Sequence, residues 1–216
     1  MSESGVTEQG ARTGDDAGRP RGALVCALLL VLTVGQLVVA TFFASGLEQF
    51  EGKGFAARLG LYPVMMLAVP LVWRFTSKRR ADPPWAAFAW IMLPYLVDVT
   101  GNTLNLYDSV TWWDDANHYV NWMFLGLGAG LLVTRGRPRP VWEIVLLVGG
   151  IGAIMAIFWE VGEYYAFIRG GTELDTAYTD TLGDEVLGTL GALTAGVITV
   201  LRGRVAGVAR VARVRS

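Results

Sequence analysis

The stretch Trp112-Trp113-Asp114-Asp115-Ala116-Asn117-His118 lies where a short polar loop gives way to a long apolar run. It contains the only histidine of the chain. Asp114 and Asp115 precede that histidine by four and three residues, so all three side chains can share one side of a helix. A helix that begins with ionisable residues and continues into apolar sequence predicts a polar site just inside an apolar bundle.

The composition around this stretch is that of a membrane protein. The chain has 216 residues, of which 53% are hydrophobic, and its mean hydropathy is +0.42. The apolar residues form long blocks separated by charged segments, which is typical of a polytopic membrane protein. A net charge of -1 and the lack of zinc-finger or RNP patterns argue against nucleic-acid binding. Cys26 is the single cysteine, which excludes an intrachain disulfide or a cysteine metal site.

The apolar blocks predict an all-α membrane protein with a six-helix transmembrane bundle over residues 23–201. A disordered cytoplasmic tail is expected at 1–22, and a basic cytoplasmic tail at 202–216. The expected helices cover residues 23–44, 56–73, 85–107, 115–134, 142–167 and 181–201.

The lysines and arginines predict the orientation of these helices. With the N-terminus inside, fifteen Lys and Arg fall on the cytoplasmic side, whereas Lys53, Arg58 and Arg169 fall outside. This asymmetry predicts that both termini are cytoplasmic, in a bacterial inner membrane.

The same orientation places many acids in the outer half of the membrane. Asp98 and Glu160 lie at similar depths, roughly 10–14 Å from the expected helix ends. Polar side chains also recur at helical spacing within each segment, which favours one shared site in the bundle interior. The expected metal ligands are Asp98, Asp115, His118, Glu160, Glu163, Asp180 and Asp184, with His118 and Glu160 as catalytic candidates and Asn102, Asn105 and Asp114 as polar support.

Several carboxylates in a medium of low dielectric constant need compensation. The outer halves of the last four expected helices contain no lysine or arginine, so the sequence offers them no internal counter-ion. Either some of these acids hold protons or a cation lies among them. Carboxylate and amide oxygens with one imidazole favour Mg²⁺, Mn²⁺ or Ca²⁺, and leave Zn²⁺ and Fe open as alternatives.

Structural roles compete with these assignments. Asp114 and Asp180 begin helices, where acids cap free N–H groups. Asn102 and Asn105 are of the type that forms hydrogen bonds between membrane helices. Glu160 and Asp184 lie inside apolar windows, which favours a functional role for both.

The second half of the chain resembles the VanZ-like and YjdF-like families of small bacterial membrane proteins. The resemblance rests on Asp114-Asp115-Ala116-Asn117-His118, Glu160-Val161-Gly162-Glu163, Asp180-Thr181-Leu182-Gly183-Asp184 and Gly188-Thr189-Leu190-Gly191-Ala192. Gly188 departs from the asparagine that VanZ-like members often have before Thr-Leu-Gly-Ala. The resemblance implies a cell-envelope setting and a site at these motifs, without an established reaction.

Three functions remain open at this stage. The first is an envelope protein with a cation site near the extracytoplasmic face, acting on an envelope lipid, a lipid-linked phosphate or an envelope glycan. The second is transport of a cation or of a proton-coupled solute. The third is a non-catalytic structural protein. Whether the chain is an enzyme, and its oligomeric state, stay open, and membrane lipids are its expected surroundings.

Overall fold

The computed structural model describes residues 18–44, 46–77, 81–135, 138–166, 168–170, 174 and 177–215, and side chains for most of those from Arg21 to Gly203. Every element in this part of the chain is helical, which confirms the prediction of an all-α protein. The helices are α1 (Gly18–Phe42), α2 (Phe55–Thr76), α3 (Trp85–Thr103), α4 (Leu106–Ser109), α5 (Trp113–Val133), α6 (Val141–Ala166), the 3-10 turn η1 (Ile168–Gly170) and α7 (Ala177–Arg215).

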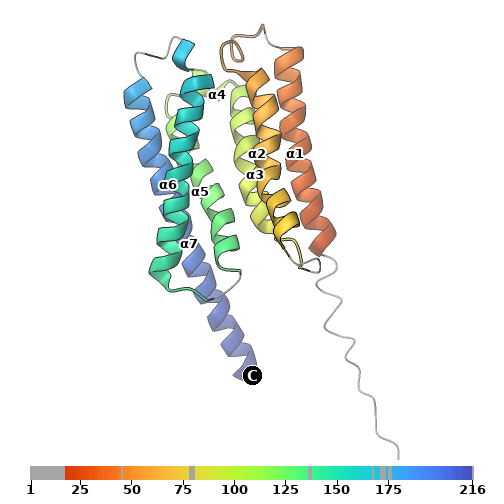
Figure 1. Ribbon diagram of the computed structural model, residues 1–216, viewed down its shortest axis with the longest axis vertical. Coiled ribbons are helices and arrows are strands. Elements are labelled where there is room, and N and C mark those ends of the chain that lie inside the picture. Colours follow the sequence, from red (N-terminus) through yellow and green to blue (C-terminus); the bar gives the residue numbers. More distant parts are fainter. Residues whose placement is uncertain are drawn as a thin grey trace, which may run out of the picture.

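The six long helices form two groups of three. Helices α1, α2 and α3 pack on one another, as do α5, α6 and α7, and the contact between α3 and α5 joins the groups (Figure 1). The short helix α4 lies at the end of the bundle where α5 and α7 begin, whereas α7 extends beyond the bundle at the opposite end (Figure 1). The first turns of α5 and α7 therefore lie at the same end.

Among the described residues, four helical segments are long and apolar enough to cross a membrane: Arg21–Phe42 of α1, α2, α6 and the Ala177–Gly203 part of α7. Helices α3 and α5 have comparable lengths of 19 and 21 residues but are not among these four, and each carries polar residues at one end, such as Asn102 in α3 and Asp115 in α5. On α6, large apolar side chains such as Ile154 and Phe158 are 57% and 65% exposed. An apolar outer surface of this kind suits contact with lipid.

Small residues bring α5, α6 and α7 close together. A Cβ atom at Gly191 of α7 would collide with the backbone oxygen of Tyr119 on α5, and one at Gly152 of α6 would collide with Ala192 on α7. Close approach through glycine is the usual packing mode of membrane helices, because no hydrophobic force acts between them in lipid. This packing keeps the polar first turns of α5 and α7 and the polar last turns of α6 within side-chain reach of one another.

Several predicted helix bounds differ from the structure. The third helix ends at Thr103, four residues before Tyr107, because Asn105 adopts a left-handed conformation with φ 58° and precedes α4. The spacing of Asn105 predicted that it shares a helical face with Asp98 and Asn102. That prediction is wrong, because Asn105 lies beyond the end of α3. The last helix is continuous to Arg215 rather than ending near residue 201. Most of the predicted N-terminal tail, residues 1–17, lies outside the described residues.

Candidate functional site

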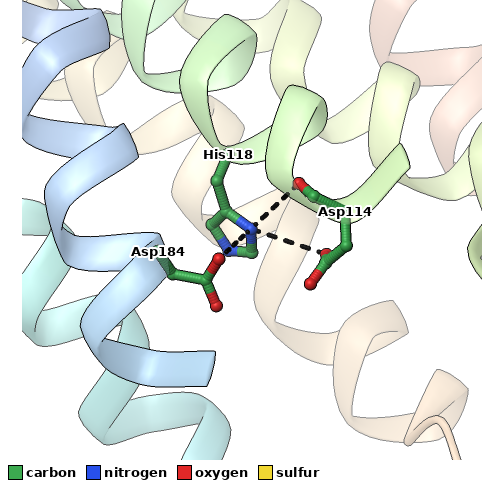
Figure 2. A group of neighbouring side chains, drawn as sticks. All are labelled: Asp114, His118 and Asp184. Atoms are coloured by element: carbon green, nitrogen blue, oxygen red, sulfur yellow. Dashed lines mark hydrogen bonds and ion pairs between the residues drawn. The ribbon is translucent and has the colours of Figure 1, made fainter. Parts of the chain in front are cut away.

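The imidazole of His118, in the second turn of α5, lies among acidic groups from three helices. Its Nδ1 atom is 2.9 Å from Asp184 Oδ1 on α7. The same nitrogen is 3.5 Å from Asp114 Oδ1 and 3.2 Å from the Asp114 backbone oxygen, one turn earlier on α5 (Figure 2). Asp184 and His118 point toward each other across the α5–α7 contact (Figure 2).

The opposite edge of the imidazole faces α6. His118 Nε2 is 3.7 Å from Glu160 Oε1, and Glu160 is only 6% exposed. Glu163 follows one turn later on α6, so both glutamates share that face. Ligand atoms of His118, Glu160 and Glu163 all lie within 4.8 Å of one another, and so do those of Asp114, His118 and Asp184. We call these five residues the His118 cluster.

The His118 cluster has donor atoms of the kinds that bind cations, at separations that could hold one. Ions such as Zn²⁺ and Mg²⁺ bind nitrogen and oxygen at about 2.0–2.2 Å, which places neighbouring ligand atoms roughly 3 Å apart. The nitrogen-to-oxygen distances around His118, 2.9–3.7 Å, are close to that separation. Imidazole nitrogen is a ligand that Zn²⁺ and Fe favour, whereas carboxylate oxygen is one that Mg²⁺, Ca²⁺ and Mn²⁺ favour. Without an ion, a protonated imidazole is the cation that the cluster itself can supply.

Asp98 lies in a different group of side chains, which corrects the expectation that the acids have no internal counter-ion. Arg58 of α2 donates to Asp98 Oδ2 at 2.6 Å, and the Tyr62 hydroxyl donates to the same oxygen at 2.6 Å. Arg58 is 7% exposed and Asp98 is 9% exposed. Arg58, expected among the external bases, is therefore a buried partner of Asp98, and neither group that could hold a metal among the described residues includes Asp98.

The Asp98 group extends through α4 to α5. The Tyr107 hydroxyl donates to Asp98 Oδ1 at 2.8 Å and accepts a hydrogen bond from Asn117 Nδ2. Asn121 Nδ2 in turn donates to Asn117 Oδ1 at 2.9 Å. Burial and the adjacent Asp98 carboxylate raise the pKa of Tyr107, so its hydroxyl keeps the proton that it donates. We call this chain of hydrogen bonds, from Arg58 to Asn121, the Asp98 network.

The two groups of polar residues are electrostatic neighbours through α6. Glu163 lies within electrostatic range of Arg58 and Asp98 of the Asp98 network and of His118 and Asp114 of the His118 cluster. The aromatic rings of Tyr62 and Trp159 also meet between α2 and α6, with centroids 6.0 Å apart. The bundle thus holds one compensated carboxylate, Asp98, next to a cluster whose carboxylates outnumber its single histidine.

The remaining predicted residues have varied surroundings. Asp115 is exposed and lies in neither of the two groups of described residues that could hold a metal. Asp180 is exposed and is an electrostatic neighbour of Asp114. Asn102 is buried and donates to the backbone oxygen of Asp98 at 3.0 Å, so it acts within α3. The amide oxygen of Asn105 is buried without a hydrogen-bond partner.

Sequence reasoning did not select Arg58, Tyr62, Tyr107 or Asn117. A usable signal existed for the first two, because an arginine and a tyrosine four residues apart share a helix face. Tyr107 and Asn117 carry no charge and are common near helix ends, so nothing in the sequence separates them from ordinary interfacial residues.

Comparison with known protein families gives a match over most of the chain. Residues 27–204 match the family described as "Predicted membrane protein (DUF2238)", and this range includes every residue of the His118 cluster and the Asp98 network. No curated protein and no solved structure matches the chain. The similarity to VanZ-like and YjdF-like proteins stays a resemblance in short motifs. Because the match covers most of the sequence, the chain belongs to this membrane-protein family.

Proposed function

We propose that the protein spans a bacterial inner membrane six times, with both termini cytoplasmic, and binds a divalent cation in the His118 cluster near the extracytoplasmic face. The observation that carries this proposal is the meeting of one imidazole with four carboxylates from α5, α6 and α7. Two of these acids, Glu160 and Asp184, are 6% and 4% exposed. Buried carboxylates in such numbers require a positive partner.

The two edges of the imidazole favour different roles. The 2.9 Å separation of His118 Nδ1 and Asp184 is a hydrogen-bond length. Histidines that bind metal usually donate their other ring N–H to a carboxylate, which fixes the ring. We therefore assign Nδ1–H as the donor to Asp184 and place the cation at Nε2, with Glu160 and Glu163 as its carboxylate ligands.

A lipid-linked phosphate is the substrate class that best fits a cation in this position. Two bases at this end of the bundle are engaged, since Lys53 pairs with Asp108 and Arg58 pairs with Asp98, whereas Arg169 is exposed and lies over the ring of Tyr165. A bound divalent cation would supply the positive charge that a phosphate needs. It would polarise a phosphoryl oxygen, with the carboxylate oxygen of Glu160 that does not bind the cation as the candidate proton carrier.

Metal analysis of the purified full-length protein tests the cation site. Protein purified in detergent without chelators is expected to retain about one transition-metal ion per chain, measured by mass spectrometry. Stripped protein should bind Mn²⁺ or Zn²⁺ in equilibrium dialysis, and Glu160→Gln and Glu163→Gln should abolish this binding. Asp184→Asn should weaken it about 10–100-fold, as expected for a residue that orients a ligand.

Asp115→Asn is the matched control, because it changes an exposed acid next to Asp114. It should bind metal as the wild type does. Lack of binding by the wild type, or equal losses in Asp115→Asn and Glu160→Gln, would overturn the proposal. Loss of binding in Asp114→Asn and Asp184→Asn, with none in Glu163→Gln, would instead place the ion at Nδ1.

Thiol labelling in intact cells tests the six-span topology. Cys26 is the only cysteine, so a Cys26→Ser variant gives a cysteine-free background. Ser109→Cys, at the end that carries α4, should react with a membrane-impermeant maleimide. Ala81→Cys, between α2 and α3, should react only after the cells are lysed. The reverse pattern would invert the proposed orientation.

A further inference from the structure

Neighbouring residues of α5 join two different polar groups. Asn117 donates to Tyr107 of α4, and His118 meets Asp184 of α7. Successive residues of a helix point about 100° apart. The second turn of α5 is therefore held by polar contacts on two sides, one neutral and one charged.

Tyr107 is fixed firmly enough to hold Asn117. Its hydroxyl donates to Asp98, and its ring packs edge-on against Trp113 with centroids 6.4 Å apart and planes at 88°. Gly101 of α3 leaves room for both rings, since a Cβ atom there would lie 2.7 Å from Trp113 Nε1 and 3.0 Å from Tyr107 Cε2. The aromatic pair thus lies directly against the α3 backbone.

The far end of the chain of hydrogen bonds is anchored as well. Asp98 accepts from Arg58 and Tyr62 of α2, and Arg58 Nε also donates to the backbone oxygen of Lys53 at 3.0 Å. Outside the bundle, Lys53 forms an ion pair of 2.7 Å with Asp108 of α4. The orientation of Asn117 therefore depends on contacts with α2, α3 and α4 together.

We propose that Tyr107 and Asn117 are positioning residues for His118. This inference rests on the proposed cation site. By fixing the rotation of the second turn of α5, the Tyr107–Asn117 hydrogen bond sets the direction in which the imidazole presents Nε2 to Glu160 and Glu163. Neither residue contacts the ion. Loss of the hydrogen bond lets the first turns of α5 rotate, which misaligns the ring relative to α6 and α7.

Because His118 is the only histidine of the chain, its ring can be observed directly in the full-length protein. Selective ¹⁵N-histidine labelling in detergent micelles reports the two ring nitrogens by NMR, and diethyl pyrocarbonate reports the reactivity of the ring. Tyr107→Phe removes only the hydroxyl, and Asn117→Ala removes its partner. Both variants should shift or broaden the His118 nitrogen signals, speed its modification, and weaken Mn²⁺ binding about 10–100-fold, as changes behind a metal ligand do.

Two controls separate positioning from a general loss of structure. Tyr178→Phe makes the same chemical change at a tyrosine of α7 that is 80% exposed, and it should leave His118 unchanged. Phe88→Leu disturbs a core side chain of α3 that is 2% exposed. It should lower the unfolding temperature without moving the His118 signals.

The results also distinguish this inference from the proposed function. Wild-type His118 signals in Tyr107→Phe, or equal changes in Phe88→Leu, would overturn the positioning role even where the wild type binds Mn²⁺. If the wild type binds no metal but Tyr107→Phe still alters the ring, the cation site fails and the positioning of His118 stands.

Discussion

Removal of the Arg58 guanidinium should destabilise the protein strongly. Among the described residues, Arg58 is the one cation paired with the buried Asp98 carboxylate. Arg58→Met keeps most of the apolar stem and deletes the charge. Taking one partner from a buried ion pair costs about 3–5 kcal/mol. Asp98 would keep the hydroxyl donors of Tyr62 and Tyr107, and hydrogen bonds to charged groups contribute about 1.5–3 kcal/mol each. We therefore expect a loss at the lower end, about 3 kcal/mol.

That loss is measurable as a shift in unfolding temperature. For a domain of this size, 1 kcal/mol corresponds to about 2–4 °C, so Arg58→Met should unfold about 6–12 °C below the wild type. The eight tryptophans allow unfolding in detergent to be followed by intrinsic fluorescence. Arg169→Met is the matched control, since Arg169 is exposed and contacts the Tyr165 ring at 5.9 Å, and it should shift the midpoint by much less.

A double variant tests the physical reason for the shift. In Arg58→Met/Asp98→Leu the buried carboxylate is gone as well, so much of the lost stability should return, as happens when buried ion pairs are replaced by apolar residues. A midpoint of Arg58→Met equal to that of Arg169→Met would refute the reasoning. The reasoning would also be refuted if the double variant lost more unfolding free energy than Arg58→Met and Asp98→Leu lose together as single variants.

Three further predictions address the surface, the helix packing and the cation. Asp108→Asn should cost at most about 1 kcal/mol in unfolding free energy, because its ion pair with Lys53 is solvent-exposed, and a loss as large as that of Arg58→Met would contradict this. Gly191→Ala should destabilise the α5–α7 contact by about 1–3 kcal/mol, whereas Gly183→Ala, where an added Cβ meets nothing within 4 Å, should be neutral in the same melting assay. Saturating Mn²⁺ at about 100 times its Kd should stabilise the wild type by about 2.7 kcal/mol, with reversal by chelator and no effect in Glu160→Gln.

The long helices could be read from the sequence because lipid imposes their lengths. The second expected helix, residues 56–73, corresponds to Phe55–Thr76, and the fifth, residues 142–167, corresponds to Val141–Ala166. The end of the third helix could not be read in the same way. Asn105 reverses the backbone there through a left-handed conformation, which asparagine tolerates but does not require.

Charged residues in apolar windows were visible in the sequence, but their partners were not. Glu160 and Asp184 stood out because ionised groups are costly in lipid, and the structure brings both to His118. Asp98 stood out for the same reason, yet its partner Arg58 lies in the first turn of α2, close to the expected helix end. A long arginine at that depth can extend to water or turn inward, and spacing alone does not decide between them.

The stretch from Trp112 to His118 shows why neutral residues escape such reasoning. Asp114 and His118 reveal themselves through the cost of burying charge, whereas Asn117 and Trp113, in the same two turns, carry no comparable penalty. In the structure the neutral residues hold α5 against α3 and α4, and the charged ones face α6 and α7. The direction of the imidazole therefore depends on hydrogen bonds and ring packing, and a hydropathy pattern does not report either of them. A site of this kind can be located from its charges, but its geometry is fixed by uncharged neighbours.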